Sequence, residues 1–333
     1  MKIAIYEAGV EDVEFLRIGL AEFEVIFINE TLKEDTVDKA KDSEIVSVFV
    51  GSSVTREVIE KMSNLKCIVT RSTGYDHIDL VACKEKGIKV MNVPSYGARA
   101  VAEHTFAILL TISRRTFEAY KQVREEGDFH VEKLEGFDLF GKTLGVVGTG
   151  RIGKNVARIA QGFGMNIIMS DMFPDEKFAQ EVGGKYVSLD ELISQSDIIT
   201  LHCPYTKENH HMIGVEQFNK MKKGVVIVNT ARGELMDTQA LFVALENKTV
   251  SHVGLDVLES ERDLKDESAL IRGGKEINNL RTLLLDHELV DDERAFITPH
   301  IAFHTREADR ERLGVVVESI KSFAEGKELK NLL

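Results

Sequence analysis

The sequence of 333 residues contains no tryptophan, four prolines and only three cysteines. The cysteines, Cys67, Cys83 and Cys203, are odd in number and are scattered without C-x-x-C spacing. This pattern disfavours a disulfide framework or a cysteine zinc site and is typical of reduced thiols, so we expect a cytoplasmic protein. Because prolines are so few and no Gly/Ser-rich tract occurs, the sequence also offers no flexible linker between domains.

Basic residues are in deficit: 42 Lys and Arg stand against 55 Asp and Glu, which gives a net charge of −13. An acidic surface repels phosphate backbones and anionic lipid, so we expect neither a nucleic-acid nor a membrane partner. The most apolar helical stretch, Phe106–Ile112, is far too short to span a bilayer. With 43% hydrophobic and 29% charged residues, the composition is that of a globular protein, and the length favours two domains.

Short apolar runs rich in β-branched residues alternate with segments of helical length along most of the chain. The predicted strands are Lys2–Tyr6, Glu24–Ile28, Ile45–Val50, Cys67–Thr70, Thr143–Gly148, Asn166–Ser170, Asp197–Leu201, Val225–Asn229, Ser251–Leu255 and Ala295–Thr298. The predicted helices between them include Asp12–Glu22, Thr55–Lys61, Ile152–Phe163 and Thr238–Glu246. Such alternation predicts an α/β fold of doubly wound parallel sheets.

The strands fall into two groups, one within about residues 1–95 and one that begins at Thr143. A long helical pattern from about Gly97 to Gly127 joins them, and its middle is apolar on every face. A helix of this kind is buried, either in a core or across a subunit interface. The charged segment of residues 260–293 is weakly periodic and is expected to be a surface excursion with a helix or two.

A G-x-G-x-x-G pattern, Gly148-Thr149-Gly150-Arg151-Ile152-Gly153, directly follows a predicted strand and opens a predicted helix. Asp171 lies 21 residues after Gly150, at the end of the next strand. This context is that of a dinucleotide site: Gly148 permits the tight turn, Gly150 admits the pyrophosphate to the backbone, and Gly153 lets helix pack on strand. The helix N-terminus offers free N–H donors to the phosphates.

Asp171 also indicates which of the two nicotinamide cofactors, NAD or NADP, the site prefers. Its carboxylate can accept hydrogen bonds from ribose hydroxyls and would repel a 2′-phosphate. The next residues, Met172 and Phe173, offer no arginine to receive that phosphate. The sequence therefore predicts NAD in preference to NADP.

Three polar side chains follow three later strands: Arg232, Glu261 and His300. In open α/β sheets, ligands bind beyond the carboxyl ends of the strands, so we expect these residues to share one crevice. Histidine can exchange the proton of a hydroxyl group, a nearby carboxylate orients it, and arginine can hold a substrate carboxylate with two hydrogen bonds. The trio predicts hydride transfer between a small 2-hydroxy acid and its 2-oxo acid. No H-E-x-x-H or Cys–His cluster occurs, so we expect no catalytic metal.

In these residues and the motifs around them, the sequence resembles the D-isomer-specific 2-hydroxyacid dehydrogenase family. The motifs that carry the resemblance are Val146–Gly153 (VVGTGRIG), Leu201–Ile213 (LHCPYTKENHHMI), Val228–Gly233 (VNTARG), Gly254–Glu261 (GLDVLESE) and Ile297–Ala302 (ITPHIA). The resemblance implies a discontinuous substrate domain of flavodoxin-like fold, residues 1–100 with 300–333, and an NAD-binding Rossmann domain of residues 101–299. It also implies a homodimer.

The family resemblance further implies the roles of individual residues. Arg232 would bind the substrate carboxylate, Glu261 would support the histidine, and His300 would be the acid/base. Asp256 would contact the nicotinamide carboxamide. Other residues that would line the cofactor pocket are Cys203, Pro204, Asn209, Thr230 and Ala231.

Within the family, the D-lactate dehydrogenase subgroup is most similar. Tyr96 and Phe303 stand where that subgroup has aromatic residues at the substrate, and the backbone of Thr73 and Gly74 would donate to the substrate carboxylate. The long stretch between Glu261 and His300 also resembles the subgroup. His304 departs from it, since tyrosine is common there, so pyruvate and a bulkier 2-oxo acid both stay open.

Other functions within this resemblance also stay open. Phosphoglycerate dehydrogenases share the trio, but their common long forms need a further regulatory domain for which 333 residues leave no room. Relatives that act on formate, phosphite or glyoxylate are disfavoured by the aromatic pair Tyr96 and Phe303. A dinucleotide-sensing, corepressor-like interaction protein would be a different class, and turnover of NADH with pyruvate separates it from an enzyme.

Overall fold

The computed structural model describes residues 1–94, 96–261, 264 and 280–333. The chain divides into two compact units, one formed by Met1–Gly97 with His304–Leu333 and the other by Ala98–Phe303. These boundaries lie close to residues 100 and 300, and they assign both His300 and Phe303 to the second unit.

Unit 1 is built on a five-stranded parallel sheet with the strand order β2-β1-β3-β4-β5, which is the flavodoxin-like order. Its strands are β1 (Lys2–Tyr6), β2 (Glu24–Ile28), β3 (Ile45–Val48), β4 (Cys67–Thr70) and β5 (Lys89–Met91). Helices α1 (Val10–Gly19) and α14 (Arg306–Ala324) bury Leu16, Leu313 and Val316 against one face. Helices α2 (Arg56–Lys61) and α3 (Leu80–Glu85) cover the other face with Val58 and Ala82.

Unit 2 is built on a seven-stranded parallel sheet with the order β12-β11-β10-β9-β6-β7-β8. Its strands are β6 (Thr143–Val147), β7 (Asn166–Ser170), β8 (Lys185–Tyr186), β9 (Ile198–Leu201), β10 (Val225–Asn229), β11 (Val250–Leu255) and β12 (Ala295–Ile297). The chain starts at β6, runs outward to β8 and then returns to β9. The point where the strand order reverses therefore lies between β6 and β9, which is where doubly wound sheets bind ligands.

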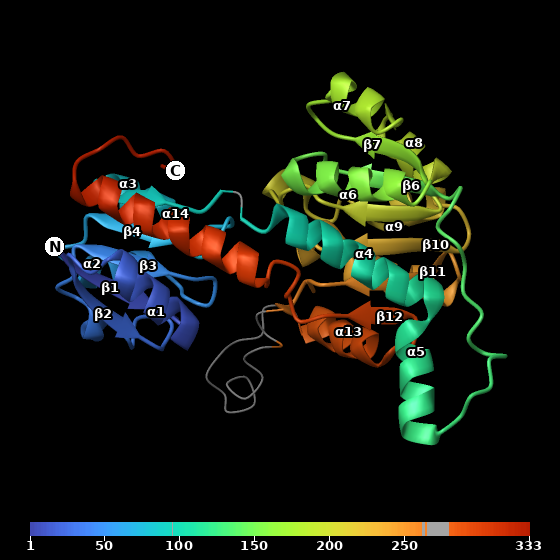
Figure 1. Cartoon of the computed structure of the whole chain (residues 1–333), viewed down its shortest axis with the longest axis horizontal. Helices are drawn as coiled ribbons and strands as arrows, with labels where there is room; N and C mark the ends of the chain where they lie inside the picture. The colour runs from blue at the N-terminus through green and yellow to red at the C-terminus, as the bar shows by residue number, and fades with distance from the viewer. Residues whose placement is uncertain (95, 262–263, 265–279) are drawn as a thin grey trace. The chain divides into compact units, whose positions relative to one another are not determined.

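Helices cover both faces of this second sheet (Figure 1). One core packs α4 (Ala98–Arg114) and α6 (Arg151–Gly162) on the sheet, with Phe106, Ile108 and Val156 buried. The core on the other face buries Leu192, Phe218 and Leu241. It is covered by α8 (Leu189–Gln195), α9 (Val215–Lys220), α10 (Thr238–Glu246) and α13 (Leu280–Asp291). Helix α7 (Glu176–Glu181) packs beside β8. The predicted fold class of two doubly wound parallel-sheet domains is confirmed.

The prediction of a single long helix from about Gly97 to Gly127 is wrong. The chain breaks at Arg115, whose φ of 49° lies in the left-handed region, and continues as α5 (Thr116–Lys121) and a wider helical turn, η2 (Gln122–Glu126). The apolar middle of α4 is buried at Phe106, Ile108, Leu109 and Ile112, whereas Leu110 and Thr111 are half-buried and the small side chain of Ala107 is exposed.

Smaller differences concern strand and helix ends. The structure adds β5 and β8, which the sequence pattern did not predict because each is only two or three residues long. Helix α1 begins and ends earlier than the predicted Asp12–Glu22. In the segment from 260 to 293, α13 accounts for an expected helix, and residues 262–263 and 265–279 lie outside the described part of the chain. Among the described residues, no helix is long and apolar enough to cross a bilayer.

Candidate active site

The glycine loop after β6 has the geometry that a pyrophosphate requires. Gly148 has a φ of +88°, and a Cβ there would lie 2.6 Å from the backbone nitrogen of Cys203, so only glycine fits this turn. A Cβ at Gly153 would lie 2.0 Å from the carbonyl oxygen of Gly148, which explains the close packing of α6 on β6. A Cβ at Gly150 would meet nothing within 4 Å. The open backbone at Gly150 precedes Arg151 and Ile152, the first residues of α6, where N–H groups favour a phosphate.

Asp171 lies directly after β7 beside this loop. Its Oδ2 accepts hydrogen bonds from the N–H of Thr149 at 2.6 Å and from the Thr149 hydroxyl at 3.1 Å, and its Oδ1 accepts from the N–H of Phe173 at 2.8 Å. The carboxylate is thus oriented next to the glycine loop. Met172 and Phe173 are largely exposed and bring no positive charge to it.

The loop after β9 faces Gly148 across the point where the strand order reverses. Asn209 shapes this loop, because its side-chain amide donates to the carbonyl oxygen of Pro204 at 2.8 Å and its Oδ1 accepts from the N–H of Thr206 at 2.7 Å. Burial lowers the pKa of His202 to about 3, so this histidine stays neutral and cannot serve as a proton donor. Burial likewise raises the pKa of the Cys203 thiol to about 11, so the thiol stays protonated.

Arg232 extends from the turn after β10, and buried Asn229 sets that turn. The Asn229 side chain donates to the carbonyl oxygen of Arg232 at 2.8 Å and accepts from the N–H of Ala231 at 3.0 Å. The hydroxyl of Thr230 lies 3.0 Å from that of Thr105 on α4. Within the described part of the chain, no carboxylate pairs with the Arg232 guanidinium, which donates to the carbonyl oxygen of Ala231 at 2.7 Å. The sequence analysis did not single out Asn229.

Glu261 and His300 form a hydrogen-bonded pair. The Nδ1 atom of His300 lies 2.9 Å from each oxygen of the Glu261 carboxylate, so Nδ1 carries a proton and the second ring nitrogen is left for other contacts. The ring of Phe303 meets the His300 ring edge-on, with centroids 6.0 Å apart. His300 has a φ of 56°, an unfavourable backbone for a side chain of this size, which persists only where neighbouring structure holds it.

Asp256 stabilises this backbone conformation of His300. Its side chain is only 1% exposed, and its oxygens accept hydrogen bonds from the Thr298 hydroxyl at 2.5 Å and from the N–H groups of Ile301 at 3.0 Å and Ala302 at 2.9 Å. Burial alone would raise the pKa of Asp256, but these hydrogen bonds and His104 outweigh it, and the pKa lies below its usual value. The carboxylate is therefore ionised, and it holds the Thr298 side chain before His300 and the backbone of Ile301 and Ala302 after it.

Arg232 follows β10, Glu261 follows β11 and His300 follows β12. These three strands are neighbours in the sheet, so the three residues lie at the same edge of it. Glu261 and His300 also border a cavity of about 1030 Å³ within unit 2. Its other walls come from α4, α5 and the segment up to Leu134, and from the end of α13 with β12.

Comparison with known proteins identifies the arrangement. The family described as "D-isomer specific 2-hydroxyacid dehydrogenase, NAD binding domain" matches residues 106–302, more than half of the chain. The chain belongs to the D-isomer-specific 2-hydroxyacid dehydrogenase family. A 2-hydroxyacid dehydrogenase homolog of Haemophilus influenzae is 41% identical to this dehydrogenase over 100% of this chain and 99% of the relative.

Two further relatives carry the name D-lactate dehydrogenase. The enzyme of Escherichia coli is 38% identical over 100% of both chains. A solved structure of the enzyme from Aquifex aeolicus, complexed with NAD and lactic acid, is 38% identical, with a TM-score of 0.89 over 99% of this chain and 98% of that one. The present chain is thus an NAD-dependent dehydrogenase of the family, and its glycine loop has the open backbone that the cofactor needs.

The remaining predicted substrate residues of the dehydrogenase lie in unit 1. Thr73 and Gly74 follow β4, where the Thr73 hydroxyl donates to the carbonyl oxygen of Val93 at 2.9 Å and the Asn92 side chain donates to that of Thr73 at 2.8 Å. Tyr96 lies 6.0 Å from the guanidinium of Arg312, measured to the ring centroid. Their contact with substrate stays a prediction.

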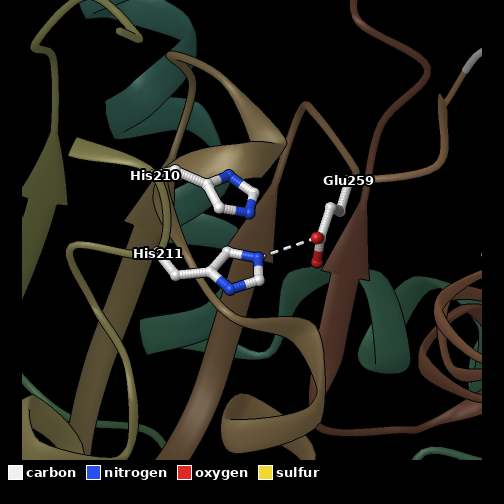
Figure 2. A group of neighbouring side chains, drawn as sticks. All are labelled: His210, His211 and Glu259. Atoms are coloured by element: carbon white, nitrogen blue, oxygen red, sulfur yellow. Dashed lines mark hydrogen bonds and ion pairs between the residues drawn. The ribbon is translucent and has the colours of Figure 1, made fainter. Parts of the chain in front are cut away.

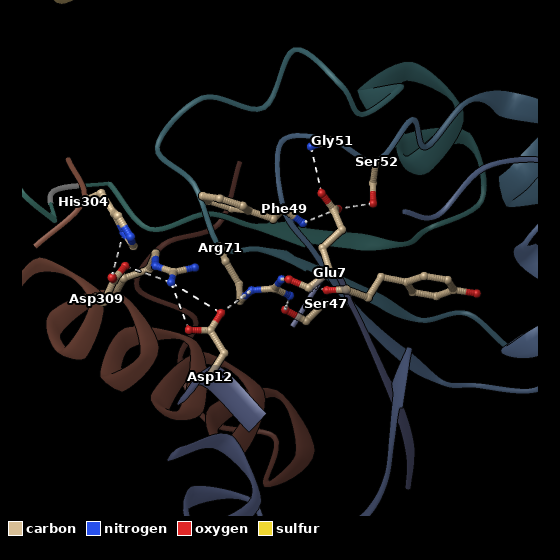
Figure 3. Close-up of polar contacts among 11 residues, drawn as sticks. Glu7, Asp12, Ser47, Phe49, Gly51, Ser52, Arg71, His304 and Asp309 are labelled. Atoms are coloured by element: carbon tan, nitrogen blue, oxygen red, sulfur yellow. Dashed lines mark hydrogen bonds and ion pairs between the residues drawn. The ribbon is translucent and has the colours of Figure 1, made fainter. Parts of the chain in front are cut away.

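Beside them, unit 1 contains a buried polar network that the sequence analysis missed (Figure 3). Arg71 is fully buried and donates to the carbonyl oxygens of Tyr6 at 2.7 Å and Glu7 at 2.9 Å. Burial lowers its pKa to about 10, while nearby Asp12 opposes the shift, so the guanidinium remains charged. Asp12 also accepts from Arg312 at 3.2 Å. The network ties the ends of β1 and β4 to α1 and α14, next to the Thr73 turn.

Proposed function

We propose that this dehydrogenase interconverts pyruvate and D-lactate, with His300 as the acid/base. The observation that carries the proposal is the His300–Glu261 pair, in which Nδ1 lies 2.9 Å from both carboxylate oxygens. The two residues follow β12 and β11, which are neighbours in the sheet. Relatives named D-lactate dehydrogenase that match the whole chain support the choice of substrate.

In the reduction, the hydride that the 2-oxo carbon gains would come from NADH held at the glycine loop Gly148–Gly153. His300 provides the proton that the substrate oxygen gains, from the ring nitrogen that Glu261 does not hold, and it is left as neutral imidazole. In the oxidation, the same nitrogen accepts the hydroxyl proton. Glu261 keeps the ring oriented, because its carboxylate accepts a hydrogen bond from Nδ1 and leaves the other ring nitrogen for the substrate.

Arg232 anchors the substrate carboxylate in this proposal. Its planar guanidinium can donate two parallel hydrogen bonds, and Asn229 fixes the backbone from which it extends. Because no described carboxylate neutralises it, its charge is available to an anionic substrate. Thr73 and Gly74 would add backbone donors, and Tyr96 and Phe303 would pack on the small methyl group of pyruvate.

We also propose that the cofactor contacts follow the sequence prediction. Asp171 would bind the ribose hydroxyls, and the helix start at Arg151 and Ile152 would bind the pyrophosphate. Cys203, Pro204, Asn209, Thr230 and Ala231 would line the nicotinamide side. Asp256 would contact the carboxamide in addition to holding the His300 backbone.

A homodimer in the cytoplasm is part of the proposal. Large apolar side chains are exposed on unit 2 along α5, which follows the end of α4 (Figure 1), and along the segment after it. Phe117, Tyr120, Phe129 and Val131 are all more than half exposed, with Phe129 at 79%. Clusters of this kind mark protein–protein contacts. A mass near twice 37.3 kDa by light scattering is the expected result.

The function is tested by NADH oxidation with a panel of 2-oxo acids: pyruvate, a branched 2-oxo acid, phenylpyruvate, hydroxypyruvate and glyoxylate. We expect the highest kcat/KM with pyruvate and a product that only a D-specific lactate assay detects. A higher kcat/KM with the branched or aromatic acid would favour the bulkier substrate, which His304 leaves open. Binding of NADH without turnover of any acid would favour a dinucleotide-sensing interaction protein.

A further inference from the structure

A cluster of two histidines and a glutamate lies outside the residues proposed for hydride transfer. His210 and His211 follow the short helical turn η3 (Lys207–Asn209), and Glu259 lies in the loop after β11. One ligand atom from each of the three side chains lies within 4.8 Å of the other two. Figure 2 shows the two imidazole rings side by side, with a nitrogen of each on the side that faces Glu259.

In each histidine, one ring nitrogen faces the centre of the cluster and the other faces an oxygen atom outside it. His211 Nε2 lies 2.7 Å from Glu259 Oε1, while its Nδ1 faces the Asp237 carboxylate at 3.9 Å. The Nδ1 of His210 lies 3.5 Å from the hydroxyl of Tyr205. In both rings Nδ1 therefore points to an oxygen, which leaves Nε2 for the centre of the cluster. Metal-binding histidines show this arrangement, in which an oxygen behind the ring fixes its orientation and tautomer.

Glu259 is also held in place. It is only 13% exposed, and its Oε2 accepts a hydrogen bond from the Thr238 hydroxyl at 2.9 Å at the start of α10. Oε1 is thereby turned toward the histidines. His211 has a left-handed φ of 53°, and its N–H donates to the carbonyl oxygen of Glu234 at 2.9 Å. The three ligand side chains thus extend from two anchored segments, the one that follows η3 and the loop after β11.

We infer that His210, His211 and Glu259 form a binding site for a divalent transition-metal ion, with Zn²⁺ as the ion that fits best. Two imidazole nitrogens and one carboxylate oxygen are a common zinc donor set, completed by water. Mg²⁺ and Ca²⁺ prefer oxygen ligands alone and do not match. On binding, the proton that His211 Nε2 shares with Glu259 is released to solvent and the neutral ring carries its one proton on Nδ1, which faces Asp237, so the ion can draw the three ligand atoms together. The ion joins the loops after β9 and β11 and takes no part in hydride transfer.

The test is titration of the metal-free full chain with Zn²⁺ by calorimetry, in the presence of saturating NADH. We expect one ion per chain. In H210A and E259Q, affinity should fall by more than about a hundredfold, because each variant removes a ligand. H130A is the matched control, since His130 is exposed and its imidazole pairs with Asp128, away from the cluster, and this variant should bind Zn²⁺ as the native chain does.

D237N separates metal binding from a purely structural role of the cluster. Asp237 caps α10 through Oδ1, which accepts from the N–H of Ala240 at 3.0 Å, and asparagine caps as well as aspartate. The substitution therefore keeps the helix but removes the charge behind His211, and affinity should fall roughly 10- to 100-fold. Co²⁺ in place of Zn²⁺ should show the visible absorption of a four-coordinate nitrogen–oxygen site in the native chain and not in H210A.

Unchanged Zn²⁺ affinity in H210A would overturn the proposal, and so would an absence of binding at millimolar Zn²⁺. His210 is exposed, so H210A should fold normally, which unaltered NADH oxidation in the presence of a chelator verifies. If E259Q unfolds, H210A and D237N still decide the question.

Discussion

The buried carboxylate of Asp256 accepts the backbone N–H of Ala302 over 2.9 Å, two residues beyond His300. The other Asp256 oxygen accepts from Ile301 and Thr298, so one side chain holds the chain before and after the proposed acid/base. The left-handed backbone of His300 depends on this support. The position of the imidazole is therefore set by Asp256 through the backbone and by Glu261 through the ring.

Replacing Asp256 by asparagine should weaken that support. An amide NH₂ would face one of the buried N–H groups and leave it unpaired, at a cost of about 1–3 kcal/mol of unfolding free energy. We expect a lower kcat with pyruvate, measured together with urea unfolding. If Asp256 also contacts the nicotinamide carboxamide, the Kd for NADH rises as well. Native stability and native kcat in D256N would remove Asp256 from the support of His300.

Asp171→Ala should relax the preference for NAD over NADP. The carboxylate lies beside the glycine loop, and Met172 and Phe173 after it bring no positive charge, so its removal ends the repulsion of a 2′-phosphate. The measurement is the ratio of kcat/KM for the two cofactors in the native enzyme and the variant. A ratio that stays the same would place Asp171 away from the ribose.

Arg232→Lys keeps the positive charge and loses the planar pair of donors. We expect kcat/KM with pyruvate to fall by about 2 kcal/mol in transition-state stabilisation, roughly thirtyfold, while NADH binding persists. Steady-state kinetics and an NADH fluorescence titration measure the two effects separately. Near-native kcat/KM would contradict Arg232 as the carboxylate anchor.

Asp286 should make stability depend on pH. It is fully buried on α13, and burial raises its pKa from 3.8 to about 6, although its Oδ2 accepts from the N–H of Ser260 at 2.9 Å. The folded state therefore binds this proton more tightly than the unfolded state, and the native chain loses stability as pH rises toward 6, by up to about 3 kcal/mol.

Asp286→Asn keeps an acceptor for Ser260 and removes the charge that forms above pH 6. Its stability relative to the native chain should thus improve by about 2 kcal/mol between about pH 4.5 and about pH 8. Urea unfolding at the two pH values measures the change. A difference between the two chains that is independent of pH would mean that Asp286 is ionised in the folded state across this range.

Much of the fold could be predicted because strands such as Lys2–Tyr6 and Val225–Asn229 are continuous apolar runs, which parallel sheets with both faces covered require. The break at Arg115 could not, because nothing in an apolar helical pattern signals a single left-handed residue. Strands β5 and β8 are too short to show a period.

The candidate site could likewise be predicted only in part. The glycine loop and the residues after β10, β11 and β12 could be predicted, because their residue types and spacing can be read from the sequence. The residues that hold them in place could not, because Asp256 bonds residues more than 40 positions later and Asn229 looks in sequence like any strand-end residue. Likewise, His211 meets Glu259 only because β9, β10 and β11 are neighbours in the sheet.

The central claim is that His300 exchanges the substrate proton while Glu261 holds its ring in place. His300→Gln keeps a polar side chain at this position but removes the group that can donate or accept the proton. The kcat/KM of this variant with pyruvate in reduction and with D-lactate in oxidation, measured together with the Kd for NADH, tests the claim most directly. The account predicts that kcat/KM falls by about 10²- to 10⁴-fold in both directions while NADH binding stays near native. Native kcat/KM in either direction would contradict the account.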